Sequence, residues 1–359
     1  MNDFHFSGVS GLAEAVRQLK SIFNQNPAEV NSKTAVESHL HNAIELDTDV
    51  KPERIKSVVT RKRFGKTAAV DGGLSILLSS GNFAVGVCKA SMVIYNQTEQ
   101  TGRIDSDEFV VVYGDGLESS LITDMGESIG MPADDPAEWR DTISSIMALK
   151  EMELMNSLLV SSENIDCLLI DGALSPPCVI DRDSYGAFLN ELYKKGIMVV
   201  GVSKSSTLRW ANNCPLVSRL EHITLERKTG DVWSCKVSSL KPGIQNAPDI
   251  PDIYLCNLYS GLGPVLRLDI PSVYSGNMDD VISGLALLSI DPEFPGYPYP
   301  LVEAHRRARI ILSRKNELID MLRINSVSEG VDIKVFNAAF TDPHDKLNAD
   351  VNQYILSGE

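Results

Sequence analysis

Two aspartates occupy similar settings in this sequence, each ending an apolar run and each followed by glycine. Asp71 follows the run 68–70 (Ala-Ala-Val), and Asp171 follows the run 168–170 (Leu-Leu-Ile). Such runs are typical of buried strands, and a following glycine lets the backbone turn away. If both strands end at one edge of a sheet, the two carboxylates can share a divalent cation. Hard oxygen ligands favour Mg²⁺ or Mn²⁺, which bind phosphate oxygens directly.

A third acidic residue precedes the second aspartate, in a stretch with helical periodicity. Glu151 lies four residues from both Met147 and Met155, so it shares their apolar face of a helix. An isolated buried carboxylate is costly, so Glu151 needs a partner or a metal. Glu153 falls on the flank of the same helix, where an exposed charge is expected. We therefore favour Glu151 over Glu153 as the third ligand.

Lys204 follows the apolar strand predicted at 197–202 and is itself followed by Ser205 and Ser206. A lysine at the end of a strand, close to hydroxyl groups and a following helix, can hold a phosphate. The alternative is a solvated loop lysine. Its predicted position at the same sheet edge as Asp171 favours a functional role.

His305 is expected on a helix that starts at Pro300, on one stripe with Leu301, Ala308 and Leu312, facing inward. A single inward histidine is more often a core residue than a ligand. The opposite face of this helix is basic, however, and Arg306 and Arg309 belong to it. A histidine for metal binding or proton transfer beside phosphate-binding arginines points to phosphodiester chemistry.

Composition constrains the class of protein. The 359 residues are 43% hydrophobic and 6% aromatic, as in an ordinary globular protein. No apolar run is long enough to span a bilayer, no secretory signal is recognisable, and the six cysteines are scattered, so we expect a cytoplasmic protein that binds no membrane. The formal net charge of −15 argues against nonspecific coating of DNA but leaves room for a local basic site.

The expected elements follow the order of an RNase H-like α/β fold, a mixed sheet flanked by helices with added strands and N-terminal helices. The strands are expected at 66–71, 74–79, 83–95, 109–113, 166–170, 197–202, 219–237 and 253–269, with turns at 72–73 and 80–82. The helices are expected at 10–24, 32–45, 136–160, 182–195, 278–289 and 300–320. A strand and a tail are expected to follow.

Several of these motifs together resemble the NurA nuclease family. In order, they are an apolar-Asp-Gly-Gly segment, a helical glutamate, Leu-Leu-Ile-Asp-Gly-Ala-Leu, a strand followed by Lys-Ser, and Tyr-Pro before an Ala-His helix. Each motif is weak alone, and their order over roughly 68–310 carries the resemblance. The chain departs from the common pattern at Gly73, where a serine is frequent.

The resemblance implies a Mn²⁺-dependent exonuclease and endonuclease that acts on DNA during end processing in homologous recombination and repair. It also implies a homodimer that works with a hexameric HerA-type ATPase. The domains would be an N-terminal helical extension at 1–60, a nuclease domain at 61–320 and a C-terminal strand and tail at 321–359, packed on the nuclease domain.

Residue by residue, the resemblance assigns metal binding and catalysis to Asp71, Glu151 or Glu153, Asp171 and His305. A family tyrosine matches Tyr254, with Tyr259 as the competing assignment. The segment at 267–269 (Arg-Leu-Asp) is similar to an Arg-x-acid segment near the family's site.

Two other functions fit parts of the sequence. An actin-like ATPase or sugar kinase also starts with a strand-Asp-Gly-Gly hairpin and repeats Asp-Gly later, but it needs a further Gly-rich adenosine segment, for which 258–264 is a thin candidate. A module that serves mainly to dock on the ATPase would not need the complete acidic set.

Overall fold

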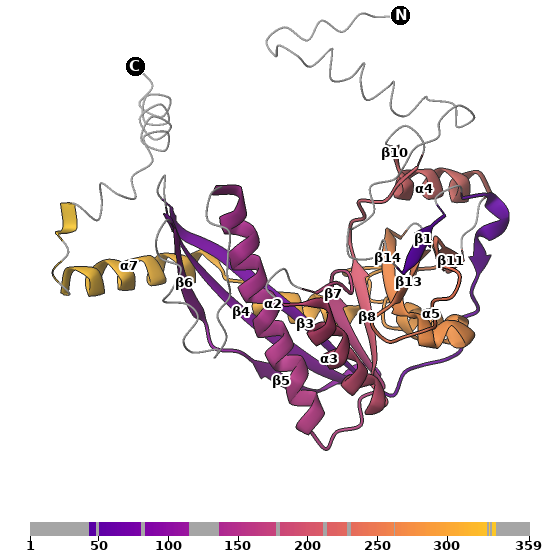
Figure 1. Ribbon diagram of the computed structural model, residues 1–359, viewed down its shortest axis with the longest axis horizontal. Coiled ribbons are helices and arrows are strands. Elements are labelled where there is room, and N and C mark those ends of the chain that lie inside the picture. The colour runs from indigo at the N-terminus through magenta and orange to yellow at the C-terminus, as the bar shows by residue number, and fades with distance from the viewer. Residues whose placement is uncertain are drawn as a thin grey trace, which may run out of the picture. The chain divides into compact units, whose positions relative to one another are not determined.

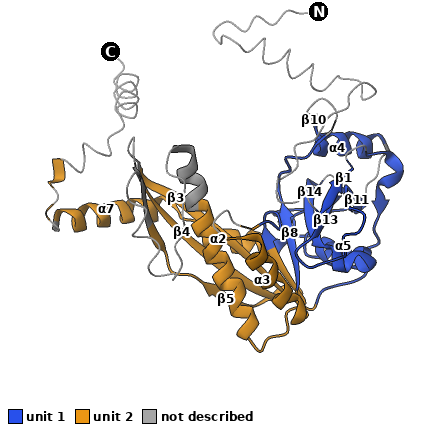
Figure 2. Ribbon diagram, viewed as in Figure 1, with its two compact units in different colours: residues 1–64, 170–175, 198–299 blue, residues 65–169, 176–197, 300–359 orange. Residues whose placement is uncertain are grey.

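The computed structural model describes residues 43–47, 50–79, 83–114, 136–176, 180–210, 214–227, 231–261, 263–328, 330 and 332–334 (Figure 1). The chain forms two compact units (Figure 2). Unit 1 comprises Met1–Phe64, Ile170–Ser175 and Met198–Tyr299; unit 2 comprises Gly65–Leu169, Pro176–Ile197 and Pro300–Glu359. Among the described helices, none has the length and hydrophobicity that crossing a membrane requires.

Unit 2 is built on a long antiparallel hairpin. Its strands are β3 (Lys66–Ser79), β4 (Phe83–Asn96), β5 (Glu99–Asp105), β6 (Phe109–Gly114) and the start of β7 (Cys167–Asp171). β3 pairs with β4, which also pairs with β5 and β6. Its helices are α2 (Pro136–Val160), α3 (Arg182–Lys194), α6 (Tyr299–Ala308) and α7 (Leu312–Ser328).

Helices cover both faces of the β3–β4 hairpin. Successive side chains of a strand point to opposite faces of the sheet. Leu74 and Ile76 of β3 pack in one cluster with Ile146 of α2. Leu77 packs in a second cluster with Leu318 of α7. The alternating apolar residues of β3 thus bury one face under α2, which crosses the hairpin in Figure 1, and the other under α7.

Unit 1 contains a second group of strands. They are β1 (Ile44–Leu46), β2 (Lys56–Ser57), β8 (Met198–Ser203), β9 (Arg209–Trp210), β10 (Cys214–Pro215), β11 (Trp233–Lys236), β12 (Ser238–Leu240), β13 (Pro251–Asn257) and β14 (Val265–Pro271). The main order is β2-β11-β13-β14-β8, with antiparallel neighbours throughout. Its helices are η2 (Pro52–Arg54), α4 (Leu216–Arg227), η3 (Ser272–Asn277) and α5 (Met278–Leu287).

The core of unit 1 lies on one face of these strands. Trp233 and Cys235 of β11 and Leu255 of β13 are almost fully buried there, together with Leu216 and Leu220 of α4. Because strand side chains alternate, Ser234 and Lys236 of β11 must point to the opposite face. That opposite face is polar.

The most informative difference from expectation concerns Gly72 and Gly73. We expected a turn at these residues, and this prediction was wrong, because β3 continues through them, with Gly72 opposite Ala90 and Gly73 opposite Lys89 on β4. The expected turn at 80–82 lies outside the described residues. The meander is therefore β3-β4-β5, and the polar strand β5 was not expected.

Three further expectations need correction. The stretch 219–237 was expected to be a strand, and only its end is one, as β11 at 233–236. α4 occupies 216–227, because Leu216, Leu220 and Ile223 follow a helical rather than a strand period. The stretch 253–269 forms two paired strands, β13 and β14, instead of one. The expected helix at 300–320 is divided into α6 and α7, and α7 extends to Ser328.

The remaining helices and strands are placed largely as expected. The helices predicted at 136–160, 182–195 and 278–289 are α2, α3 and α5, and the strands predicted at 166–170 and 197–202 are β7 and β8. The helix expected at 10–24 lies outside the described residues, as does most of the one at 32–45, whose end is β1 instead.

Candidate functional site

A buried aspartate and an accessible histidine meet in unit 2. Asp71 is 6% exposed in β3. Its Oδ2 atom lies 2.7 Å from Nδ1 of His305, and its Oδ1 atom accepts a hydrogen bond from the Gly72 amide at 2.8 Å. The His305 side chain is 54% exposed. The pair therefore couples a fixed carboxylate to an imidazole that solvent and ligands can reach.

Gly73 explains how α6 comes so close to Asp71. Residues 71 and 73 point to the same face of β3, because side chains alternate along a strand. A Cβ on Gly73 would overlap the carbonyl oxygen of Ala308 at the end of α6. Glycine is therefore required here for close approach of a helix.

The position of His305 differs from the inward one we expected. Leu301, Ala304 and Ala308 are fully buried, and His305 lies beside this buried stripe, half exposed. The predicted stripe also stops early, because α6 ends at Ala308 and Leu312 is an exposed residue of α7. A helix of only ten residues can place its last residues at the margin of the core.

Glu151 lies against β3 at the residue after Asp71. A Cβ on Gly72 would lie 2.5 Å from Oε1 of Glu151, so this carboxylate packs directly over the glycine backbone. Gly72 faces α2, whereas Asp71 faces α6, because adjacent strand residues point to opposite faces. Glu153 is exposed, and Lys150 pairs with it at 3.0 Å.

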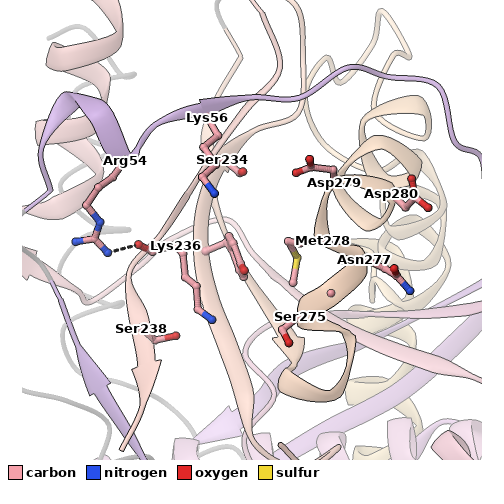
Figure 3. A pocket seen from close by; sticks show the side chains of 12 residues that line it. Arg54, Lys56, Ser234, Lys236, Ser238, Ser275, Asn277, Met278, Asp279 and Asp280 are labelled. Carbon is pink, nitrogen blue, oxygen red and sulfur yellow. Dashed lines mark hydrogen bonds between the residues drawn. The ribbon is translucent and has the colours of Figure 1, made fainter.

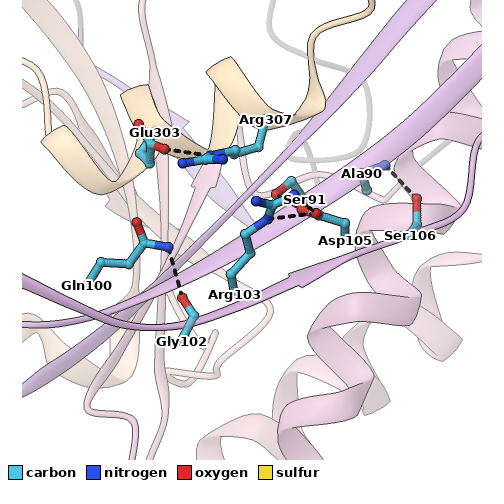
Figure 4. Close-up of polar contacts among 9 residues, drawn as sticks. All are labelled: Ala90, Ser91, Gln100, Gly102, Arg103, Asp105, Ser106, Glu303 and Arg307. Carbon is cyan, nitrogen blue, oxygen red and sulfur yellow. Dashed lines mark hydrogen bonds and ion pairs between the residues drawn. The ribbon is translucent and has the colours of Figure 1, made fainter.

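A polar row continues from Asp71 across the neighbouring strands. Ser91 of β4 lies directly opposite Asp71, and Asp105 of β5 lies opposite Ser91. The buried hydroxyl of Ser91 donates to Asp105 at 2.6 Å, and Arg103 forms an ion pair with the same carboxylate (Figure 4). The hydrogen bond from Arg103 is the main reason that the pKa of Asp105 is lowered.

This row was missed from the sequence, because β5 is polar and exposed and does not read as a strand. The cross-strand register alone makes Ser91 a neighbour of Asp71. Arg103 also experiences the charge of Glu303 on α6, which pairs with Arg307 at 2.6 Å (Figure 4).

The arginines after His305 are accessible but partly neutralised. Arg306 lies 3.8 Å from Glu303, and Arg314 pairs with Glu108 and Glu317, both at 2.7 Å. Arg309 is exposed and has no ion-pair partner among the described residues. Directly after the end of α6, it is therefore the cation of this segment most available to a phosphate.

Unit 1 holds the second predicted aspartate. Asp171 ends β7, and Gly172 then turns the chain with a φ of +144°, as the sequence led us to expect. Oδ2 of Asp171 lies 2.6 Å from Nζ of Lys204, which follows the end of β8. The Lys204 ammonium also lies 4.9 Å from the centre of the Tyr297 ring, a contact that the sequence analysis missed.

An arginine–aspartate pair supports the loop after Asp171. Arg267 and Asp269 are both nearly fully buried and form two hydrogen bonds, at 2.7 and 2.9 Å. Asp269 also accepts a hydrogen bond from the Leu174 amide at 3.1 Å. The Arg-x-acid segment therefore anchors the backbone three residues beyond Asp171. No helix follows Lys204 directly; the short strand β9 does.

Tyr254 lies on β13, opposite Lys236 of β11, and lines a cavity of unit 1. Burial raises the pKa of its phenol. Tyr259, the competing assignment, lies in the loop after β13, where its amide donates to the Asn257 side chain at 2.8 Å.

Comparison with known proteins identifies the family to which this chain belongs. A family model described as "NurA domain" matches residues 65–310. The crystal structure of the NurA nuclease from Sulfolobus solfataricus aligns over 89% of this chain and 96% of its own, with 16% identity and a TM-score of 0.52. No curated protein matches significantly.

Two more distant structures are endonucleases V. The enzyme from Ciona intestinalis, in complex with a 24mer DNA, covers 87% of this chain and 100% of its own at 11% identity, with a TM-score of 0.37. The catalytic domain of human endonuclease V covers 74% of this chain and 92% of its own, with 13% identity and a TM-score of 0.37. The family match spans most of the chain, and the expected α/β fold, a mixed sheet flanked by helices, is confirmed. The chain belongs to the NurA domain family.

Proposed function

We propose that this protein is a nuclease that hydrolyses phosphodiester bonds in DNA, as an exonuclease and an endonuclease, with a divalent cation held by Asp71, Asp171 and His305. The observation that supports this most is the 2.7 Å contact between Asp71 and His305, a buried carboxylate joined to an accessible imidazole. The resemblance adds Glu151 to the acidic set, and this carboxylate packs over the adjacent Gly72 from the α2 side of β3.

The donor atoms fit such a cation. Asp71 and Asp171 each offer a carboxylate oxygen, and His305 offers a ring nitrogen. Mg²⁺ strongly prefers oxygen, so a set that includes imidazole favours Mn²⁺.

Side chains of the protein would bind the substrate, stabilise its charge and transfer protons. A bound divalent ion would activate water and stabilise charge on the phosphate. Lys204, held by Asp171 and Tyr297, is positioned to neutralise developing negative charge. Arg306 on α6 and Arg309, the residue that follows α6, would contact the phosphodiester backbone, together with Tyr254, which the resemblance matches to a family tyrosine. The second ring nitrogen of His305 would bind the cation or, as the alternative, transfer a proton.

The actin-like ATPase alternative loses its structural basis. That function needs a glycine turn after Asp71 to hold phosphate, whereas β3 continues through Gly72 and Gly73. Both glycines are occupied by close packing with α2 and α6. Family membership points the same way.

The biological setting is also part of the proposal. From the family, we propose a homodimer that acts with a hexameric HerA-type ATPase in DNA-end processing during recombination and repair. Light scattering tests the dimer, and co-purification with such an ATPase tests the partnership. A monomer that binds no ATPase would contradict this part and leave the nuclease proposal standing.

The decisive experiment is digestion of end-labelled DNA over a range of Mn²⁺ and Mg²⁺ concentrations. Asp71→Ala and Asp171→Ala should each abolish cleavage while circular dichroism shows a folded protein. Asp183→Ala, an exposed residue of α3, is the matched control and should remain active. Full activity in purified Asp71→Ala would show that the proposed site is wrong.

A further inference from the structure

Unit 1 contains a cavity of about 590 Å³ on the polar side of its strands. One wall is formed by β2, β11 and β13, where Lys56 pairs with Ser234 and Lys236 pairs with Tyr254 in the strand register. The other wall is formed by η3 and the first turn of α5. Figure 3 shows the open space between these two walls.

The strand wall is basic. Arg54, Lys56 and Lys236 all line it. Arg54 is held by Asp47 at 2.7 Å and by the Lys236 carbonyl, and Lys236 is held by the buried Asp252 at 2.6 Å. Lys56 is exposed, and none of the described residues forms an ion pair with it. Two cations are therefore fixed in place, and a third is available for a ligand.

The same wall offers uncharged donors. The hydroxyls of Ser234 and Ser238 line the cavity, with the phenol of Tyr254 and, from η3, the hydroxyl of Ser275. Ser234 and Ser238 are 5% and 3% exposed, so their positions are fixed by packing. Fixed hydroxyls beside cations are the groups that recognise a phosphate.

The helical wall is acidic. Asp279 and Asp280 line it in the first turn of α5, and in Figure 3 the Asp279 carboxylate lies across the open space from Lys56 and Ser234. A bare phosphate would be attracted by the cations of the strand wall and repelled by these carboxylates. A nucleotide would place its phosphate on the cations and its ribose hydroxyls or base amino group on the carboxylates.

We propose that this cavity is a binding site for a nucleoside phosphomonoester, separate from the metal site and independent of it. Its volume lies within the ~300–1,000 Å³ usual for small-ligand pockets. Every residue that lines it belongs to unit 1, and none is among the proposed metal ligands. The phosphomonoester can be that of a free nucleotide or of the 5′ end of a DNA chain.

Calorimetric titration of the full-length Asp71→Ala protein in EDTA isolates this site from metal and catalysis. Nucleoside 5′-monophosphates should bind, and inorganic phosphate should bind at least tenfold more weakly. Lys56→Glu should weaken nucleotide binding at least tenfold. Lys51→Glu reverses the charge of an exposed lysine of the same unit that does not line the cavity, and it should bind normally. Asp279→Asn should reduce the preference for nucleotide over inorganic phosphate.

Competition identifies the source of the phosphomonoester. If a 5′-phosphorylated oligonucleotide displaces the bound nucleotide and its 5′-hydroxyl counterpart does not, the site binds DNA ends. If only free nucleotides displace it, the site binds a nucleotide. Three results would each overturn the proposal. They are that nucleotides do not bind, that Lys56→Glu binds them as tightly as the protein without this change, or that Lys51→Glu weakens nucleotide binding as much as Lys56→Glu does.

Discussion

Nδ1 of His305 lies 2.7 Å from Oδ2 of Asp71, so the last turn of α6 is joined to the middle of β3. This contact uses one ring nitrogen and leaves Nε2 for a cation or a substrate proton. A histidine oriented by a carboxylate is a common arrangement in metal sites, where the second group fixes the ring. The pair therefore suggests that the two ring nitrogens have different tasks.

Asparagine at position 305 separates these two tasks, because its amide can replace Nδ1 but does not reach the position of Nε2. We expect His305→Asn to lower the cleavage rate by roughly 10–100-fold and to raise the Mn²⁺ concentration needed for half-maximal activity. Metal titrations of DNA cleavage measure both values. His222→Asn, at an exposed position of α4, is the control. Wild-type activity in His305→Asn would mean that Nε2 has no role.

Gly73→Ala tests the close approach of α6. The new methyl group would overlap the Ala308 carbonyl, so α6 must move and carry His305 with it. We expect a loss of about 1–3 kcal/mol in unfolding free energy, together with reduced cleavage. Urea denaturation measures the first effect. Gly276→Ala is the matched control, because no atom lies within 4 Å of its added Cβ. Equal stability of the two variants would contradict the packing argument.

The two Asp-Gly segments show what a local pattern can and cannot predict. After Asp171, glycine turns the chain with a positive φ, as expected. After Asp71, the same dipeptide continues as strand, and its glycines are needed because α2 and α6 approach from opposite sides. Those helices lie about 80 and 230 residues away in sequence. A local window therefore contains no signal that separates the two uses.

Periodic segments were predictable, whereas polar ones were not. α2 and α3 carry enough helical pattern to be found, and the apolar strands β7 and β8 are recognisable by composition. β5 is exposed at every residue except Gly102, so it gave no signal, and Arg103 and Asp105 were missed with it. The role of Ser91 depends on strand register, which a single sequence does not specify.

Glutamine substitutions at positions 151 and 153 test which glutamate belongs to the site. Glu151 packs over Gly72, next to Asp71, whereas Glu153 is exposed and paired with Lys150. We expect Glu151→Gln to lose roughly 100-fold or more in cleavage rate and Glu153→Gln to lose less than twofold, because an exposed ion pair contributes little. Single-turnover digestion of labelled DNA measures both rates. The reverse order would assign the role to Glu153.

Lys204→Met tests whether this lysine acts on the substrate or only holds Asp171. Its ammonium lies 2.6 Å from the Asp171 carboxylate, so it would compete with a cation for one of the proposed metal ligands. Removing the charge should let Mn²⁺ bind more tightly, because lysine no longer competes for that oxygen. The maximal rate should fall by about 10–100-fold, because a cation is lost beside the phosphate. Lys194→Met, which breaks an exposed pair with Glu191, is the control. Weaker metal binding together with lower stability would show instead that Lys204 only supports Asp171.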